Sequence, residues 1–313
     1  MEVNIYKNVF KQVEEELVMK DITVLTPTYN REKNLYKLYN SLCIQTNKDF
    51  VWMIIDDGST DNTKEVVNKW RDENKIEIVY IYKANGGKHT ALNVGIKNIN
   101  TYMTFIVDSD DWLVDNAIEI IYKYYNKYKN INELCGFSFL RKFPNGEINN
   151  KLFPVNEKIE SYIDSRVNGN IMGDKAEVFY TKCLKEFPFP EFPNEKFISE
   201  AVIWIKMALK YKMVHINEAI YVGDYLSNGL TKNIKKNKIK APLGNIELAK
   251  VLMYKECCLK SRIKGMLFYI IYGNFAKFSF KKLLNDIDNK IAFILLYPVG
   301  KCIQIYWKYK YCN

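Results

Sequence analysis

Hydrophobic and polar residues follow two different periods over about the first 130 residues of the chain. Short apolar runs rich in β-branched and aromatic residues are typical of buried strands, whereas apolar residues that recur every three or four positions predict helices. The predicted order is strand 22–25, helix 35–42, strand 51–55, helix 63–74, strand 76–82, a helix that ends at about residue 97, strand 102–107 and helix 116–128. Strands that alternate with helices predict an α/β fold with a doubly wound, mostly parallel sheet.

A polar cluster follows each of the four predicted strands. The clusters are TPTYNR at 26–31, DDGSTD at 56–61, NGGKHTALN at 85–93 and DSDD at 108–111. In doubly wound sheets, ligands bind beyond the carboxyl ends of the strands. We therefore expect the four clusters to lie at one edge of the sheet and to border one crevice.

The residue types in these clusters suit a nucleotide and a metal ion. Asp108 and Asp110 crowd carboxylates at the end of an apolar strand, and a divalent cation that bridges to a phosphate removes their repulsion. Lys88 is a point charge suited to a diphosphate. Tyr29 can stack on a base, and Asp57 can accept a hydrogen bond from one. Each cluster alone also fits an ordinary turn, so the argument depends on all four occurring together.

The motifs TPTYNR, DDGSTDNT, NGGKHTALNVGI and FIVDSDDWL resemble, in order and spacing, family 2 of the inverting glycosyltransferases. The resemblance is strong over about residues 20–130 and weaker to about residue 230. It implies a GT-A fold, in which a Rossmann-like, mostly parallel sheet is flanked by helices. It also implies transfer of a sugar from a nucleotide-sugar donor, with Mn²⁺ or Mg²⁺ as cofactor. The expected donor is a UDP-hexose or UDP-N-acetylhexosamine, and the expected acceptor is a glycan or lipid-linked saccharide of a bacterial surface polysaccharide.

The resemblance also assigns site residues. Asp110 is the implied metal ligand, and Asp108 lies nearer the ribose. Many family members have Ala-Arg-Asn where this chain has Ala91-Leu92-Asn93, so an arginine contact to the donor is missing, and Lys88 is a candidate replacement. The full set of expected donor-binding residues is Thr26, Pro27, Tyr29, Arg31, Asp56, Asp57, Lys88, Asn93, Asp108 and Ser109.

An inverting transfer needs a base that takes the proton of the acceptor hydroxyl. In the resembling family this base is an acidic residue at the start of a helix after the acceptor loop. Glu200 is the expected catalytic residue, and Glu195 is the second candidate. The alternative for Glu200 is that it only stabilises a helix N-terminus through the helix dipole.

The sequence is less regular between about residues 134 and 211. A strand at 136–143, a turn at 144–146 and a second strand from 147 are predicted. Residues 173–179 predict another strand or helix, and the proline-rich stretch 187–193 predicts a rigid loop. This loop leads into segment 195–211, which is expected to contain a mostly buried helix.

Charge divides the chain into two parts. The net charge is +10, yet residues 231–313 contain 17 Lys and Arg against 4 Asp and Glu, a net of +13. We expect a catalytic domain at 1–230, with a nucleotide-sugar half at 20–130 and an acceptor half at 131–230. Residues 231–313 are then a basic, mainly helical extension.

The extension combines basic and apolar segments. A basic loop is predicted at 232–240 and a helix at 246–260. The apolar stretch 291–307 contains Pro298, Gly300 and Lys301, and is too short and too charged for a membrane span. Basic amphipathic segments favour peripheral contact with an anionic membrane. The alternative is a helical subdomain whose lysines face solvent. No nucleic-acid-binding motif accompanies the charge, so no nucleic acid is expected.

The cysteines and the N-terminal segment bear on location. The seven cysteines are scattered and form no CxxC pair, and the chain has only two histidines. No zinc site is therefore expected. Reduced thiols indicate a cytoplasmic protein, and the basic extension suggests the inner face of the cell membrane. Residues 1–20 predict a charged amphipathic helix without the apolar core of a signal peptide.

Two other functions would use some of these features. A sugar-phosphate nucleotidyltransferase also uses a nucleotide-binding α/β domain, but it needs a glycine-rich loop with Arg and Lys near the N-terminus, which this chain lacks. A non-catalytic, basic membrane-peripheral or nucleic-acid-binding protein is the other rival. The intact DSDD motif at 108–111 argues against it.

Overall fold

The computed structural model describes residues 20–149, 151–171, 173–223 and 234–312. The predicted N-terminal helix, apart from residue 20, and the predicted domain boundary at residue 230 lie outside the described residues. The first half contains β1 (Ile22–Thr28), α2 (Leu35–Cys43), β2 (Phe50–Asp56), α3 (Thr63–Glu73), β3 (Ile78–Tyr82), α4 (Lys88–Asn98), β4 (Met103–Ile106), β5 (Trp112–Leu113) and α5 (Ala117–Tyr128).

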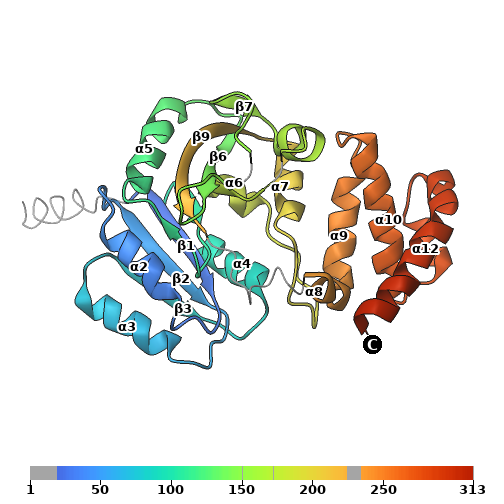
Figure 1. Ribbon diagram of the computed structural model, residues 1–313, viewed down its shortest axis with the longest axis horizontal. Helices are drawn as coiled ribbons and strands as arrows, with labels where there is room; N and C mark the ends of the chain where they lie inside the picture. Colours follow the sequence, from blue (N-terminus) through green and yellow to red (C-terminus); the bar gives the residue numbers. More distant parts are fainter. Residues whose placement is uncertain (1–19, 150, 172, 224–233, 313) are drawn as a thin grey trace, which may run out of the picture.

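The second half continues the same sheet and then becomes helical (Figure 1). It contains β6 (Leu134–Lys142), β7 (Lys158–Glu160), the π-helical η1 (Ile163–Asn168), β8 (Lys175–Tyr180), α6 (Thr181–Glu186), α7 (Ala201–Ala208) and β9 (Lys212–Val222). The C-terminal helices are α8 (Ile234–Lys240), α9 (Pro242–Leu252), α10 (Leu259–Phe275), α11 (Phe280–Asn285) and α12 (Lys290–Cys312).

The described strands form one nine-stranded sheet. Its order is β3-β2-β1-β4-β8-β6-β9-β5, and β7 pairs with β9. β3, β2, β1 and β4 are mutually parallel, whereas β8 is antiparallel to both β4 and β6. Every residue of β1 is buried because helices cover both faces of the sheet, and this explains the uninterrupted apolar runs. The predicted α/β fold with a mostly parallel sheet is confirmed.

The strand register brings the polar clusters together. Thr28 at the end of β1 pairs with Asp56 at the end of β2, and Asp56 pairs with Tyr82 at the end of β3. The loops that carry the second and third motifs therefore leave the sheet side by side. The expectation that the clusters share one edge follows directly from this parallel alignment.

Three local predictions were wrong. The second strand of the expected hairpin is only a bridge between Lys142 and Ile148, since the chain leaves the sheet after the turn. The basic segment 232–240 was predicted as a loop, but from Ile234 it forms α8, because lysine is a fair helix former and Ile239 is buried. The next helix is α9, which starts earlier than expected because Pro242 occupies its first position. Further along, Pro298 lies inside α12, which runs from Lys290 to Cys312.

The C-terminal helices build a second hydrophobic core beside the sheet domain. Ile246, Tyr269, Leu283 and Phe293 are buried in it, contributed by α9, α10, α11 and α12. α9 joins the two cores, because Leu248 and Val251 on the same helix belong to the core of the sheet domain. The expected helical extension is therefore present and is packed against the sheet domain through α9. Among the described helices, none is long and apolar enough to cross a membrane.

Candidate active site

The loops after β1 and β2 are held together by reciprocal hydrogen bonds. The Asn30 backbone N–H donates to Ser59 Oγ at 2.9 Å, and the Thr60 N–H donates to Asn30 Oδ1 at 2.8 Å. Asn30 has a φ of 52°, a left-handed conformation that asparagine tolerates better than most residues. Tyr29 is 47% exposed beside this junction, which leaves its ring free to stack on a ligand.

Asp56 and Asp57 are buried and organise the neighbouring loops. Asp56 accepts hydrogen bonds from the Ser59 N–H at 2.7 Å and the Tyr80 hydroxyl at 2.6 Å. Asp57 accepts from the N–H groups of Gly86 and Gly87, and from Lys83 Nζ at 2.6 Å. Sequence reasoning missed this scaffold. The contact of Asp57 with a base stays a prediction.

Three other expected donor residues lie in different settings. Thr26 is fully buried in β1, next to Pro27, and its Oγ1 accepts from Trp52 Nε1 at 3.0 Å. Ser109 is buried in the DSDD turn. Arg31 reaches this turn from the first loop, where its guanidinium lies 3.8 Å from Asp110 Oδ2. The first and fourth motifs are thus linked by a charge pair.

Asn93 points away from these loops. Its Nδ2 donates to the Phe189 carbonyl at 2.9 Å and to Glu191 Oε1 at 2.8 Å, and its Oδ1 accepts from the Phe189 N–H at 2.8 Å. The side chain therefore anchors the proline-rich loop to α4. Its assignment to the donor stays a prediction, but this geometry gives it a structural role.

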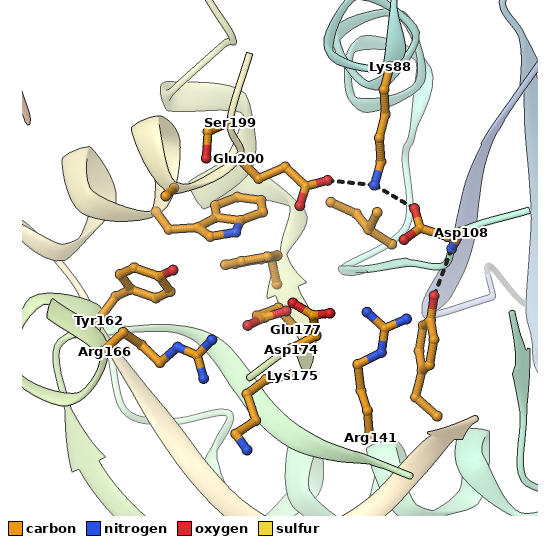
Figure 2. A pocket seen from close by; sticks show the side chains of 15 residues that line it. Lys88, Asp108, Arg141, Tyr162, Arg166, Asp174, Lys175, Glu177, Ser199 and Glu200 are labelled. Carbon is orange, nitrogen blue, oxygen red and sulfur yellow. Dashed lines mark hydrogen bonds and ion pairs between the residues drawn. The ribbon is translucent and has the colours of Figure 1, made fainter. Parts of the chain in front are cut away.

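Lys88 connects two motifs that are far apart in the sequence (Figure 2). Its Nζ lies 2.8 Å from Glu200 Oε1 and also hydrogen-bonds Asp108 Oδ1. Burial alone would lower the pKa of Lys88, but the two carboxylates outweigh it and raise that pKa above its ordinary value. Burial would likewise raise the pKa of Asp108, yet Lys88 and Arg141 hold it below its ordinary value.

A close backbone contact brings Glu200 to Lys88. Gly87 has a φ of +98°, and a Cβ at this position would lie 2.3 Å from the carbonyl oxygen of Lys196. Only glycine permits this approach. The loop that precedes α7 therefore packs on the start of α4. Glu200 stands at the N-cap position of α7, where its side chain points into the cleft instead of capping the helix (Figure 2).

Glu195, the second candidate base, is directed away from the cleft. It is 8% exposed, and its two carboxylate oxygens accept from the N–H groups of Leu243 and Gly244, each at 2.8 Å. These groups lie in the first turn of α9, whose free N–H donors attract a carboxylate. Glu195 thus ties the C-terminal extension to the loop that carries Glu200.

Asp111 supports the DSDD turn from behind. Its Oδ2 accepts from the Tyr221 hydroxyl at 2.8 Å and from Arg141, whose guanidinium lies 3.8 Å from the centroid of the Tyr221 ring. The Tyr221 hydroxyl also accepts from the Asp108 N–H at 3.0 Å. Burial, partly offset by Arg141, raises the pKa of Asp111 to about 7. No sequence signal linked Arg141 or Tyr221 to this motif.

The far wall of the cleft carries charges of both signs. Beside Lys88, Asp108 and Glu200, it is lined by Arg141, Tyr162, Arg166, Asp174, Lys175, Glu177, Ser199 and Trp204 (Figure 2). Trp204 is 7% exposed and stacks on Phe179 with centroids 4.4 Å apart, which makes it chiefly a packing residue. Charged and hydroxyl groups beside the aromatic rings of Tyr162 and Trp204 suit a polar, hydrogen-bonding ligand such as a sugar.

Glu177 offers a pH test of this wall. Burial raises its pKa from 4.5 to about 7. Between these pH values the folded protein holds a proton that the unfolded chain has lost, so stability falls as the pH rises, by at most about 1.4 kcal/mol per pH unit. The variant Glu177→Gln should remove this loss. Its gain in unfolding free energy over the wild type should grow up to about pH 7 and then level off.

Urea unfolding of both proteins from pH 5 to 8 measures this difference. The exposed Glu147→Gln is the matched control. A gain for Glu177→Gln that is constant over this range would contradict the raised pKa.

The carboxylates of the DSDD turn fit a metal ion that is shared with a ligand. Among the described residues, no group of three or more His, Cys, Asp or Glu side chains could hold a metal ion alone. Asp108 and Asp110 are partly exposed, with side-chain exposures of 33% and 26%. Mg²⁺ is often bound through one or two carboxylates together with phosphates of the substrate. The residues present therefore fit Mg²⁺ or Mn²⁺ only together with a diphosphate.

Comparisons with known proteins find glycosyltransferases among the relatives of this chain. The sequence model of the family described as "Glycosyl transferase family 2" matches residues 23–174, which include all four motifs. The chain is 38% identical over 36% of its length to "Glycosyltransferase GlyA" of Streptococcus pneumoniae, and covers 16% of that protein. It is 26% identical to "GalNAc(5)-diNAcBac-PP-undecaprenol beta-1,3-glucosyltransferase" of Campylobacter jejuni, covering 89% of this chain and 93% of that protein. An uncharacterized glycosyltransferase of Rickettsia felis is 29% identical, and the chain spans 36% of it.

Solved structures share the fold. Residues 1–349 of S. aureus TarS superpose with a TM-score of 0.59 at 19% identity, covering 94% of this chain and 92% of that one. The mannosyltransferase PcManGT from Pyrobaculum calidifontis gives a TM-score of 0.56 at 15% identity, covering 98% and 89%. At these identities the likeness establishes the GT-A fold alone. The four motifs, the sheet order and the family match agree, and residues 23–174 of this chain match glycosyltransferase family 2.

Proposed function

We propose that this protein is a metal-dependent inverting glycosyltransferase. It transfers a sugar from a UDP-hexose or UDP-N-acetylhexosamine to a glycan or lipid-linked saccharide during synthesis of a cell-surface polysaccharide. The observation that carries this proposal is the contact of Lys88 with both Asp108 and Glu200, since it joins the donor-side motif to the candidate base in one cleft. Two relatives support the choice of substrates: one S. aureus TarS structure is a complex with UDP-GlcNAc, and the C. jejuni relative is named for an undecaprenol-linked acceptor.

The loops at the carboxyl ends of the parallel strands would bind the donor. Tyr29 is exposed where a base can stack, and Asp57, buried in the second loop, would accept a hydrogen bond from that base. Asp108 would contact the ribose, Asp110 would hold the metal, and Lys88 would contact the diphosphate. When bound, the metal neutralises the negative charge that builds up on the departing diphosphate.

Glu200 would act on the acceptor. As the acceptor hydroxyl oxygen bonds to the anomeric carbon, the bond from that carbon to the diphosphate oxygen breaks, and the hydroxyl proton passes to the Glu200 carboxylate. Attack from the side opposite the nucleotide inverts the anomeric configuration. The ion pair with Lys88 holds the Glu200 side chain toward the cleft before substrate arrives. Arg166, Lys175 and Glu177 would then provide hydrogen bonds to the acceptor sugar.

The same proposal places the enzyme in the cytoplasm, at the inner face of the cell membrane. Nucleotide sugars are water-soluble, whereas a lipid-linked acceptor presents its sugar at a membrane surface. An enzyme that joins the two must therefore work at this boundary.

Release of nucleoside diphosphate from a panel of UDP-, GDP- and dTDP-sugars tests the proposal. The reactions contain Mn²⁺ or EDTA, each with and without a mixture of glycan and lipid-linked acceptors. We expect release from one UDP-sugar, with Mn²⁺ only, and faster with one acceptor. Absence of any nucleotide or nucleotide-sugar binding in calorimetry with Mn²⁺ would overturn the proposal.

A further inference from the structure

One face of α12 exposes an unusual row of large apolar side chains. The most exposed are Ile291 at 75%, Tyr309 at 74% and Leu295 at 71%. Four more are at least half exposed, and the complete row is Ile291, Ile294, Leu295, Val299, Ile305, Tyr306 and Tyr309. At about 3.6 residues per turn, these positions fall on one side of the helix. A continuous apolar strip of this kind is uncommon on the free surface of a soluble protein.

The opposite side of α12 is packed against the subdomain along its length. Phe293 is fully buried, Gly300 lies against Ile270 of α10, and the Trp307 ring contacts the Tyr272 ring with centroids 6.1 Å apart. A Cβ on residue 300 would lie 2.6 Å from Ile270 Cγ2, so glycine allows the two helices to approach closely. α12 is thus fixed lengthwise on α10, at the end of the molecule opposite α2 and α3 (Figure 1). Its apolar strip faces outward.

Positive charge borders the strip, and α12 contains no acidic residue. At helical spacing, Lys290 and Lys308 fall along one edge of the strip and Lys310 falls on the other, whereas Lys301 donates to Asn274 Oδ1 of α10 at 2.7 Å. A second copy of the chain would bring the same lysines to the contact and would be repelled. An anionic lipid surface would attract them, and their aliphatic stems can lie on the apolar region while the ammonium groups reach the headgroups. Tyrosines such as Tyr306 and Tyr309 suit the boundary between headgroups and acyl chains.

We infer that the outward face of α12 docks on an anionic membrane surface, with the helix axis in the plane of the bilayer. The apolar strip enters the boundary between headgroups and acyl chains, and the bordering lysines pair with lipid phosphates. The role of this docking in catalysis rests on the proposed function, in which the acceptor is lipid-linked. The docking itself requires no catalysis.

A continuous set of contacts links this face to the active site. α12 packs on α10, and α10 packs on α9. The first turn of α9 binds the carboxylate of Glu195, which lies in the loop that ends at Glu200. A membrane bound at α12 would therefore hold the cleft at a set position relative to the lipid surface.

Co-sedimentation of the full chain with vesicles tests the inference. We expect binding to vesicles of phosphatidylcholine with about 30% phosphatidylglycerol, weak binding to phosphatidylcholine alone, and weaker binding at high salt. The double variant Lys290→Gln and Lys308→Gln should bind the anionic vesicles about 25-fold more weakly, since each lysine contributes about fivefold. The double variant Leu295→Ser and Ile305→Ser should lose about tenfold or more.

The matched control is the double variant Ile44→Ser and Leu209→Ser, which removes two comparably exposed apolar side chains from the sheet domain and should bind like the wild type. Because all these positions are exposed, folding should be retained, and circular dichroism checks this. Equal losses in control and α12 variants, or no binding by the wild type, would overturn the inference. So would a wild-type dimer that is dissociated by the double variant Leu295→Ser and Ile305→Ser.

The catalytic variant Glu200→Gln should bind vesicles normally. Failure of the proposed chemistry would therefore not be mistaken for failure of docking.

Discussion

Replacing Glu200 with glutamine is expected to lower the rate of sugar transfer by about 10²- to 10⁴-fold, the range that a general base contributes. Glutamine keeps the size and shape of the side chain but cannot accept the acceptor proton. Lys88 retains its hydrogen bond with Asp108, so the donor site should remain intact. The measurement is the initial rate of nucleoside-diphosphate release with the donor and acceptor selected by the panel, together with calorimetric binding of that donor.

Glu195→Gln is the matched control for this experiment. It makes the same chemical change five residues earlier, at a carboxylate that caps α9. Loss of one of its two backbone hydrogen bonds should lower the unfolding free energy by about 1–3 kcal/mol, while the folded enzyme keeps most of its activity. If Glu195→Gln abolished transfer and Glu200→Gln retained it, the base would have been assigned to the wrong residue.

Asp110→Asn is expected to remove most of the effect of the metal ion. A metal that stabilises charge on the leaving group contributes several kcal/mol, so the transfer rate in Mn²⁺ should fall by about a thousandfold. Donor binding should also become nearly independent of Mn²⁺, because a neutral amide is a weaker ligand than a carboxylate. Calorimetric titration of the donor, with Mn²⁺ and with EDTA, measures this directly.

The exposed Asp115→Asn, in the segment that follows the DSDD turn, is the control for general effects of charge. It should leave both rate and metal dependence unchanged. If Asp110→Asn bound the donor with the same Mn²⁺ dependence as the wild type, Asp110 would not be the metal ligand.

The strands and the motif positions in the first half could be predicted because both depend on neighbouring residues. β1 and β2 are apolar runs covered on both faces, and polar residues begin where each strand leaves the core. Contacts across the fold decided what the local pattern did not show. Asn93, whose assignment to the donor stays a prediction, binds the loop at Phe189, about a hundred residues away in the chain. In the same way, the basic segment at 232–240 gave no local sign that Ile239 would be buried in a helix.

The α/β fold, the four motifs at the strand ends and the basic character of the extension could all be inferred from the sequence. Apolar periodicity and residue chemistry are local properties, so they are visible before the chain folds. The tertiary structure alone decided which charges meet. It placed Glu200 on Lys88 through the glycine contact at Gly87, and it directed Glu195 to α9. It also buried one face of α12 and left the other exposed. The reason is physical: the sequences of α7, α9 and α12 allow several packings, and only the assembled cores select one of them.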